Sequence, residues 1–389
     1  MSGVVTARIG EFCETGSGGT PSRENWVRYY DSGTIPWVKS GELREGIVTH
    51  TEEHITEAAL QETSAKLVPS GAVLLAMYGA TVGRLAILGV QAATNQAVCH
   101  IVPDPKKADA RYLFHGLRAQ VPKLILRGVG GAQPNISQTI VKELSVPLPA
   151  LEEQRRIAEV LDRAEGLRAK RRSALAKLDA LTQSIFLDLF GDPVENQKNW
   201  PKAKMGDILR IRRGGSPRPI EQFLGGTINW IKIGDATGGD DVYLYRCAEK
   251  ITEAGLKKTV FLRSGTLIFA NCGVSLGFAR ILKIDGCIHD GWLSLEDIPE
   301  TKLDKFFLLK ALNAITLRFR AMAPEGTQPN LNTQLMKNFE VILPPIDLQR
   351  TFSRQFERLS DLKMRQQRSL SQLDALFAAL QQRAFRGEL

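Results

Sequence analysis

The chain has 389 residues, of which 43% are hydrophobic and 24% charged, a composition typical of globular proteins rather than of disordered or fibrous ones. Its 51 Lys and Arg residues against 42 Asp and Glu give a net charge of +9, which permits nucleic-acid binding without requiring it. No apolar run is long enough to predict a membrane span or a signal peptide. The five cysteines are odd in number and lack metal-ligand spacing, so we expect reduced thiols in a cytoplasmic protein.

Residues 1 to about 150 are rich in Gly, Pro and short apolar runs. The runs Val73–Ala76, Leu85–Leu88 and Val98–Val102 lie between turn signals and predict short strands. Ala110–Gln120 has the pattern of a helix inside the same region. We therefore expect a domain of mixed α and β structure, whose topology the pattern does not specify.

A long helix is predicted next, because residues 152–189 contain no Pro and no Gly except Gly166. Apolar residues recur there at steps of three and four, as in a coiled-coil seam. The seam positions are Ile157, Leu161, Ala164, Leu175, Leu178, Ile185 and Leu189. A helix of about 36 residues is about 54 Å long at about 1.5 Å per residue, so its apolar stripe needs a cover.

The second half of the chain repeats the first at an offset of about 195 residues. Ile35-Pro-Trp37 recurs as Ile228-Asn-Trp230, and a helix predicted at Leu303–Asn313 matches the one at Ala110–Gln120. The second seam comprises Phe352, Phe356, Leu359, Leu370, Leu373, Leu380 and Ala384. We expect two copies of one fold, whose intervening side chains differ enough for two different ligands.

Both seams are interrupted by polar residues at the same two central steps, Arg168 and Arg171 in the first helix and Lys363 and Gln366 in the second. We predict that the two helices pair as an antiparallel coiled coil, which brings these polar steps close together. The alternative is that each helix packs on its own domain. A wider apolar flank on the first helix suits the helices of a partner: Val160, Leu167, Leu181 and Phe186.

Catalytic motifs are absent from both copies. The sequence has no P-loop, no dinucleotide-binding glycine motif after a strand, no His-Glu-x-x-His and no Gly-x-Ser-x-Gly. The Asn/Asp-Pro-Pro-aromatic tetrad of amino-methyltransferases is also missing, and none of the five histidines recurs at a matching position. Mainly Gly, Pro, Trp and apolar residues repeat, so we expect a protein without catalysis of its own, although an unrecognised active site is a further alternative.

The ordered set of motifs in both halves resembles the specificity subunits of type I restriction-modification systems. The first copy has Gly19-Thr-Pro21, Ile35-Pro-Trp37, Ile55-Thr-Glu-Ala58, Gly79 to Gly83, Gln133-Pro-Asn135, and Pro149-Ala-Leu-Glu-Glu-Gln-Arg155 before the long helix. The second has Gly215-Ser-Pro217, Asn229-Trp230, Ile251-Thr-Glu-Ala254, Gly273 to Gly277, Gln328-Pro-Asn330 and Pro345-Ile-Asp-Leu-Gln-Arg350. Each motif is weak by itself, but the duplicated set covers essentially the whole chain.

The resemblance implies an α+β protein with two target recognition domains, residues 1–150 and 191–346, each followed by a spacer helix, 151–190 and 347–389. Each domain would read one half of a split, asymmetric DNA site. The helices would set the spacing and dock two methyltransferase subunits, and restriction subunits would join for cleavage. No cofactor is expected on this chain; S-adenosylmethionine, Mg and ATP are expected on the partner subunits.

Candidate DNA contacts are the cations and amides of the loops, since Arg contacts guanine and Asn or Gln contacts adenine most readily. In the first domain they are Arg23, Lys39, Arg84, Asn95, Gln96, Arg127 and Gln133. In the second domain they are Arg218, Lys232, Asn271, Ser275, His289, Arg320 and Gln328. For each of them a solvated surface or turn residue is the alternative. Trp37 and Trp230 are expected to be core anchors, and Gln133-Pro-Asn135 is open to being a cap for a helix near Ser137.

The residues expected to pair the spacer helices or to contact partners are the seam residues Ile157, Leu161, Leu175, Leu178, Ile185, Phe352, Phe356, Leu370, Leu373 and Leu380. Two other functions stay open at this point. One is a scaffold of two ligand-binding domains on a coiled-coil rod. The other is the specificity subunit of a related methyltransferase or nuclease assembly that lacks a translocase.

Overall fold

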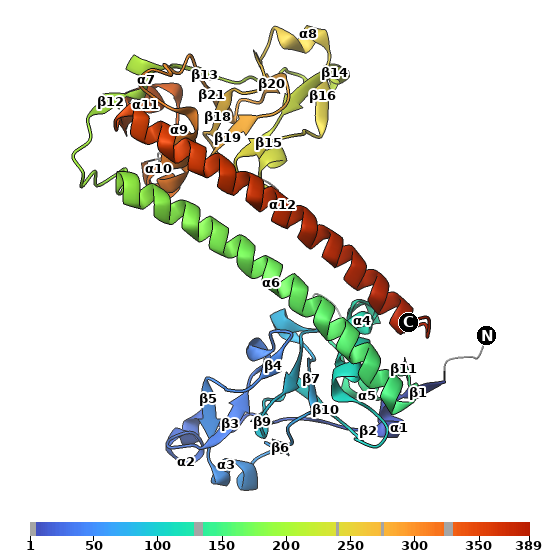
Figure 1. Cartoon of the computed structure of the whole chain (residues 1–389). Helices are drawn as coiled ribbons and strands as arrows, with labels where there is room; N and C mark the ends of the chain where they lie inside the picture. Colours follow the sequence, from blue (N-terminus) through green and yellow to red (C-terminus); the bar gives the residue numbers. More distant parts are fainter. Residues whose placement is uncertain (1–4, 128–134, 239–240, 274–275, 323–329) are drawn as a thin grey trace. The chain divides into compact units, whose positions relative to one another are not determined.

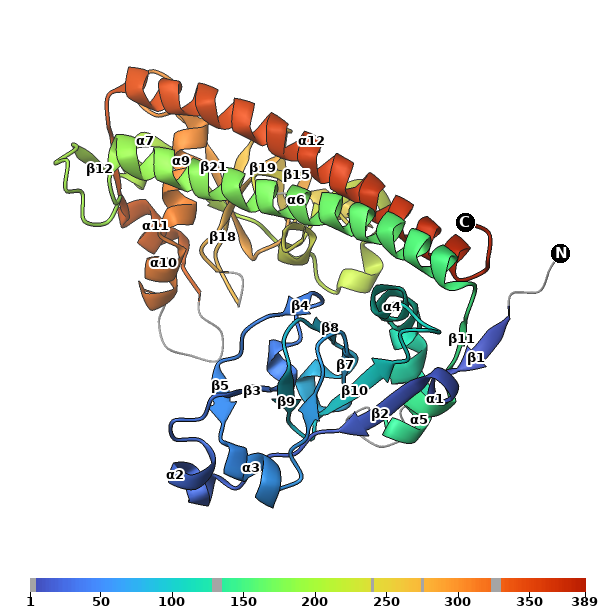
Figure 2. The ribbon, with the colours of Figure 1, turned by 60° about the horizontal axis from the view of Figure 1, so that its bottom comes forward.

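The computed structural model describes residues 5–127, 135–238, 241–273, 276–322 and 330–389. The chain forms two compact units, unit 1 from residues 1–173 and 367–389 and unit 2 from residues 174–366. Each unit contains one mixed α/β domain and one part of each of two long helices, α6 (Leu151–Phe190) and α12 (Ile346–Ala384) (Figures 1 and 2). The predicted class, a duplicated mixed domain followed each time by a long helix, is therefore confirmed.

Unit 1 contains a five-stranded and a four-stranded sheet. The larger has the order β2 (Cys13–Ser17), β10 (Val98–Pro103), β7 (Val73–Ala76), β8 (Leu85–Leu88) and β4 (Ile47–Val48). The smaller has the order β5 (Glu53–Ile55), β3 (Ile35–Val38), β9 (Ala92–Thr94) and β6 (Leu67–Val68). Pairing is antiparallel except between β4 and β8 and between β3 and β9, and β1 (Thr6–Arg8) pairs separately with β11 (Ser145–Pro147).

Unit 2 repeats this strand order. Its larger sheet is β13 (Arg210–Arg213), β21 (Trp292–Glu296), β18 (Leu267–Ala270), β19 (Ala279–Leu282) and β15 (Tyr243–Leu244). Its smaller sheet is β16 (Glu249–Ile251), β14 (Leu224–Ile231), β20 (Gly286–Ile288) and β17 (Val260–Leu262), and β12 (Lys202–Lys204) pairs with β22 (Glu340–Ile342). The repeated motifs thus mark a repeated fold. The two copies differ at β14, which is longer than β3 and has an irregular register between Leu224 and Ile228.

Both faces of the central strands are buried, which explains their continuous apolar runs. In β7, Val73 and Leu75 pack with the side chains of α4 (Ala110–Arg127), whereas Leu74 and Ala76 pack with those of the smaller sheet. A strand covered on two sides lacks the alternation of apolar and polar residues that marks a half-exposed strand.

The remaining helices are short. In unit 1 they are α1 (Ile9–Phe12), α2 (Trp26–Tyr29), α3 (Glu57–Glu62) and α5 (Gln138–Glu143). In unit 2 they are α7 (Met205–Ile208), α8 (Glu253–Leu256), α9 (Lys305–Ala314), α10 (Thr316–Met322) and α11 (Thr333–Asn338). The helix predicted from Leu303 begins at Lys305, because the Asp304 carboxylate accepts the N–H groups of Phe306 and Phe307 and caps the helix there. No helix in the described ranges is long and apolar enough to cross a membrane.

The long helices pair antiparallel within each unit. In unit 1, Ile157, Leu161 and Ala164 of the first part of α6 pack with Phe377 and Ala384 of the last part of α12. Tyr112 of α4 belongs to the same cluster, so the helices pack on the domain as well as on each other. Both arrangements that the sequence left open are therefore present.

Unit 2 makes the corresponding contact with aromatic side chains. Phe186 and Phe190, at the end of α6, pack against Phe352 at the start of α12 and against Phe307 of α9. Phe190, Phe307 and Phe352 are almost fully buried. The burial on α6 thus lies at Phe186 and Phe190, one position beyond the predicted seam residues Ile185 and Leu189, which are half-buried.

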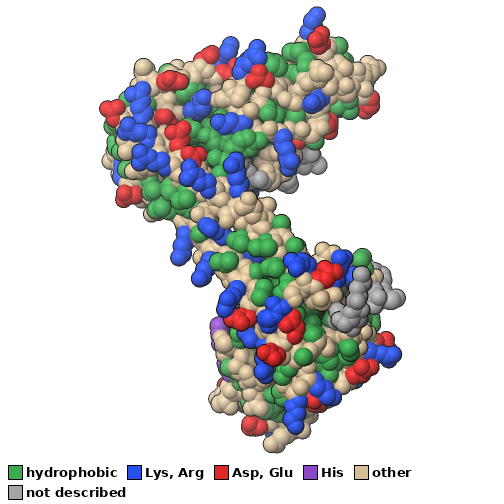
Figure 3. All heavy atoms as spheres, turned by 45° about the vertical axis from the view of Figure 1, so that its right-hand side comes forward, with side chains coloured by type: hydrophobic (Ala, Val, Ile, Leu, Met, Phe, Trp, Pro, Cys, Tyr) green, Lys and Arg blue, Asp and Glu red, His purple; other side chains and the backbone are tan. Residues whose placement is uncertain are grey.

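The middle of the predicted seam is less buried than its ends, since Leu175, Leu178, Leu370 and Leu373 are all half-buried. Two of the central polar steps are paired within their own units: Arg168 forms an ion pair with Asp374, and Lys363 with Asp179, at 2.6 and 2.7 Å. Hydrophobic side chains are also exposed along the helices, between basic ones (Figure 3).

Candidate nucleic-acid interface

The repeated tryptophan of each unit fixes a Gly-Gly turn beside the smaller sheet. The indole N–H of Trp37 donates to the Gly19 carbonyl at 3.1 Å, and that of Trp230 to the Gly215 carbonyl at 3.4 Å. Trp37 and Trp230 are 2% and 3% exposed, so both are core anchors, as expected. A Cβ on Gly18 would lie 1.8 Å from the Thr94 carbonyl oxygen, so only glycine lets this turn approach the end of β9.

The repeated lysines after these tryptophans are paired with carboxylates. Lys39 Nζ lies 2.8 Å from Glu53 Oε1 and 3.1 Å from Glu52 Oε2, and Lys232 pairs with Glu249. The hydrogen bond to Glu53 raises the pKa of Lys39 above its usual value. Lys39 and Lys232 are thus half-buried cations of fixed position rather than free surface charges, and their role in DNA contact stays a prediction.

Four predicted contacts of unit 1 lie around the smaller sheet. Arg23 pairs with Glu53 at 2.7 Å, on the carboxylate that also holds Lys39, and its guanidinium lies over the Tyr30 ring at 4.3 Å. Gln96 accepts a hydrogen bond from the Thr20 hydroxyl in the turn. Asn95 is beside it, and its Oδ1 is buried without a hydrogen-bond partner among the described residues. The structure therefore brings Arg23, Lys39, Asn95 and Gln96 together.

Three predicted contacts of unit 2 line one pocket of about 280 Å³. Arg218, Lys232 and His289 surround it together with Ser216, Trp230 and Glu249. The Ser216 hydroxyl is buried and has no partner within the described part of the chain. Burial lowers the pKa of His289, and Asp290 opposes this shift while nearby cations add to it. The pocket thus places an unpartnered hydroxyl beside the charged side chains of Arg218, Lys232 and Glu249.

The equivalent positions of the two units carry different hydrogen-bonding groups. The turn holds Thr20 in unit 1 and Ser216 in unit 2, but the loop after the third strand of the smaller sheet holds Asn95-Gln96 in one and His289-Asp290 in the other. Amides, imidazole and carboxylate present different donor and acceptor patterns. One scaffold therefore displays two chemically distinct surfaces.

The other predicted contacts lie on or near the hairpin of the larger sheet. Arg84 is exposed just after Gly83, and Arg127 ends α4. Arg320 of α10 donates from Nε to the Leu276 carbonyl at 3.2 Å, which ties α10 to the hairpin. Asn271 is fully buried and donates to the Leu331 carbonyl, so its side chain has no surface for a ligand in this arrangement. Gln133, Ser275 and Gln328 lie outside the described residues.

Backbone hydrogen bonds join these segments at one edge of each domain. In unit 2, Asn271 N–H donates to the Gly291 carbonyl and Leu331 N–H to the Asn271 carbonyl. In unit 1, Met77 N–H donates to the Ala97 carbonyl and Ile136 N–H to the Met77 carbonyl. The hairpin, the loop that contains Asn95 or His289, and the exit of the Gln-Pro-Asn segment therefore meet.

The cap of α5 is Ser137 itself, whose hydroxyl accepts the Ile140 N–H at 3.3 Å, and Asn332 caps α11 in the same way. The N-caps are therefore Ser137 and Asn332, each two residues after the Asn that ends a Gln-Pro-Asn tripeptide.

Two residues of the site were missed from the sequence: the carboxylates Glu53 and Glu249. Both stand two residues before the Ile of the repeated Ile-Thr-Glu-Ala motif, so their own repetition was a signal. Trp26 was also missed; it is 47% exposed, stacks on Tyr30 at 4.8 Å and lies under the Arg23 guanidinium. No counterpart in the second half of the sequence marks it.

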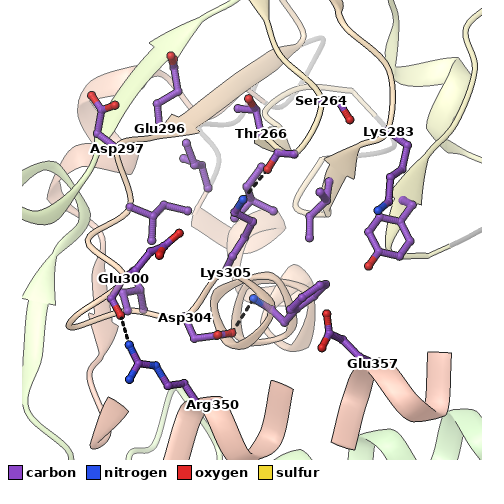
Figure 4. A pocket seen from close by; sticks show the side chains of 18 residues that line it. Ser264, Thr266, Lys283, Glu296, Asp297, Glu300, Asp304, Lys305, Arg350 and Glu357 are labelled. Carbon is purple, nitrogen blue, oxygen red and sulfur yellow. Dashed lines mark hydrogen bonds between the residues drawn. The ribbon is translucent and has the colours of Figure 1, made fainter. Parts of the chain in front are cut away.

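A larger pocket of unit 2, about 760 Å³, is a poor site for an anion (Figure 4). Five carboxylate side chains line it against three cations. Its polar groups also serve the fold, since Lys305 donates to the Gly265 carbonyl at 2.7 Å and Arg350 to the Glu300 carbonyl at 3.1 Å. The described ranges contain no group of three or more His, Cys, Asp or Glu side chains that could hold a metal ion.

Comparison with known proteins identifies the repeated domain. The profile of the type I restriction modification DNA specificity domain matches residues 1–176 and again 197–373. The MjaIX type I restriction enzyme specificity subunit of Methanocaldococcus jannaschii is 25% identical over 411 residues, which cover 98% of this chain and 92% of the relative. The EcoKI specificity subunit of Escherichia coli K12 is 22% identical, over 100% of this chain and 89% of the relative.

Solved structures share the fold. A crystal structure of the type I restriction-modification S subunit from M. genitalium has a TM-score of 0.60 at 18% identity, over 98% of this chain and 96% of that one. A chain from a structure on assembly and conformational transition of the type I R-M system also has a TM-score of 0.60, at 21% identity, over 100% and 99% of the two chains. With a specificity domain in each half, this chain belongs to the type I restriction-modification DNA specificity family.

Proposed function

We propose that this specificity subunit reads a two-part, asymmetric DNA site, with one half-site for each unit. One observation carries the proposal: the same loop of the repeated fold holds different hydrogen-bonding groups in the two units, Asn95-Gln96 in unit 1 and His289-Asp290 in unit 2. Because the major groove distinguishes base pairs by their donors and acceptors, different groups on one scaffold select different bases. Arg23 and Arg218 lie at the same edges of the two domains, where contacts to phosphates would fix the position of each domain on the duplex.

The chain itself supplies no chemistry under this proposal. Adenine methylation with S-adenosylmethionine, and cleavage with Mg and ATP, are assigned to methyltransferase and restriction subunits. The support is the lack of repeated catalytic groups in the sequence and the membership of the family. A protein that recognises without reacting needs only that its contacts differ between right and wrong sequences.

The long helices are proposed to dock two methyltransferase subunits. Unit 1 exposes Leu167 and Leu376, which are 53% and 50% exposed, and unit 2 exposes Leu362 and Leu181 at 41% and 46%. These residues are equivalent in pairs at the repeat offset, so each unit presents the same two leucines. Large apolar side chains exposed at repeated positions are typical of surfaces that bind a partner.

Methylome sequencing of cells with and without the gene tests the proposal. We expect loss of one split adenine-methylation motif when the gene is removed. Exchange of residues 1–150 for the target recognition domain (reading domain) of another specificity subunit should then change one half of the motif and leave the other half intact. A change in both halves, or binding of the purified methyltransferase complex to all duplexes equally at physiological salt, would contradict the proposal.

A further inference from the structure

In unit 1, a line of alternating charges connects the reading domain to both long helices. Arg118 of α4 lies 2.9 Å from Glu45, in the loop before β4, and 3.1 Å from Glu165 of α6. Glu165 also holds Arg168 at 2.5 Å, and Arg168 reaches Asp374 of α12 at 2.6 Å. One continuous network therefore contacts a loop of the reading domain, its helix and both spacer helices.

An aromatic ring completes this network. The Phe377 side chain of α12 is 5% exposed, and the guanidinium groups of Arg118 and Arg168 lie over it at 5.3 and 4.5 Å. Arg168 is only 12% exposed, so it depends on its carboxylate partners. Burial opposes the ionisation of Glu165, but Arg118 and its other arginine neighbours outweigh this effect and hold the pKa of Glu165 below its usual range.

Unit 2 has an equivalent network made of different residues. Asp241, in the loop before β15, lies 3.0 Å from Lys363 of α12 and 3.7 Å from Lys310 of α9. Lys363 also reaches Asp179 of α6 at 2.7 Å. Burial raises the pKa of Asp241, but Lys310 and Lys363 more than reverse this and keep it lowered.

The two networks correspond at three positions in the duplicated sequence. Glu45 matches Asp241, Arg168 matches Lys363, and Asp374 matches Asp179, each at an offset of 195 or 196 residues. Each of these three positions is charged in both copies, whereas Arg118 and Glu165 correspond to the uncharged Asn313 and Ser360. The common feature of the three charged positions is the junction of the reading domain with the helices.

We propose that these networks are positioning devices, which fix the angle between each reading domain and the helix pair and so determine how strictly the protein selects the length of unread DNA between the half-sites. The inference rests on the proposed function. Planar guanidinium groups held by two carboxylates resist rotation of α4 against α6. One base pair more or less in the gap moves a half-site by about 3.4 Å and rotates it by about 35°, so a stiff junction penalises every wrong gap.

The test measures gap selectivity in the complex with the methyltransferase subunits. The probes are duplexes with both half-sites identified by methylome sequencing and a gap that is correct, one base pair shorter or one base pair longer. Arg118→Met removes the central cation of unit 1. Glu45→Gln is the milder variant, because Glu45 is 52% exposed and its loss does not threaten folding. Arg163→Met is the matched control, since Arg163 is 77% exposed and, among the described residues, its ion pair is with Glu159 of its own helix.

We expect both test variants to lower the affinity ratio between the correct and altered gaps by about threefold or more, without a change in the bases preferred within either half-site. The control should keep the ratio of the unaltered protein. An unchanged ratio in a folded Glu45→Gln protein would overturn the inference, and so would a loss of base preference together with gap selectivity. If the unaltered complex reads no split site at all, the proposed function fails instead.

Discussion

Truncation of Phe190 to alanine should selectively destabilise unit 2. Phe190 is fully buried and packs against three other rings, with centroid distances of 4.6 Å to Phe307, 5.1 Å to Phe186 and 5.6 Å to Phe352. Loss of a buried Phe side chain costs about 3–5 kcal/mol, because the transferred area is lost and a cavity stays behind. Since about 1 kcal/mol shifts the melting temperature of a domain this size by roughly 2–4 °C, we expect a decrease of about 6–20 °C for unit 2.

The assay combines scanning calorimetry with hydrogen exchange followed by mass spectrometry, which reports on peptides from each unit separately. Peptides of α9 and β21 should lose protection in Phe190→Ala, while peptides of β7 and β10 in unit 1 keep theirs. Leu187→Ala on the same helix is the control, because Leu187 is 41% exposed and its loss should cost about 0.5 kcal/mol or less. A cost below about 1 kcal/mol for Phe190→Ala would refute the reasoning that this aromatic cluster joins α6 to the second domain.

Three further results are expected. His289→Ala should weaken discrimination at one base pair of the second half-site by about 1–3 kcal/mol and leave the first half-site unchanged; methylome sequencing would show a relaxed position, and a relaxed first half-site would contradict the assignment. Arg218→Met should reduce the slope of log K against log salt by about 0.9 if the side chain contacts one phosphate, and an unchanged slope would remove it from the interface. The pKa of Glu165 is lower in the folded state than in the unfolded chain, where it is about 4.3, so its ionised form stabilises the fold above that pH. This stabilisation is lost as the pH falls through the folded-state pKa. Glu165→Gln should therefore flatten the pH dependence of the free energy of unfolding in that acidic range, and an equally steep profile would refute the network's role.

The duplication and the long helices were predictable because each rests on local sequence signals. A long segment without Pro and with one Gly, in which apolar residues recur at steps of three and four, predicts a helix by itself. A motif such as Ile35-Pro-Trp37 can be found again at Ile228 from the sequence alone, without knowledge of its neighbours in space. The sheet topology was not predictable. Its parallel pairs, β3 with β9 and β4 with β8, join segments far apart in the chain, and the apolar runs do not encode their partners.

The arrangement of the candidate site was predictable in part for the same reason, while its contact with DNA stays a prediction. The turn, strand and loop that carry Arg23, Lys39, Asn95 and Gln96 were identified, but their proximity depends on close backbone approach at Gly18 and on the parallel pairing of β3 with β9. Asn271 shows the limit of reasoning from residue type. An amide suited to reading adenine is instead buried and bound to the backbone, because its position follows a strand that is covered on both faces.

The repeated pairing of lysine with glutamate explains why the modest net charge is compatible with DNA reading. A free lysine on this edge would attract any phosphate, and such attraction adds affinity without distinguishing sequences. Glu53 and Glu249 form ion pairs with the two lysines, so under the proposed function approach of DNA would have to compete with an existing ion pair. That competition is favourable only where the DNA offers matching donors and acceptors to the neighbouring loop. Under the proposed function, the two carboxylates would therefore weaken the general attraction to phosphate and make binding depend on base sequence.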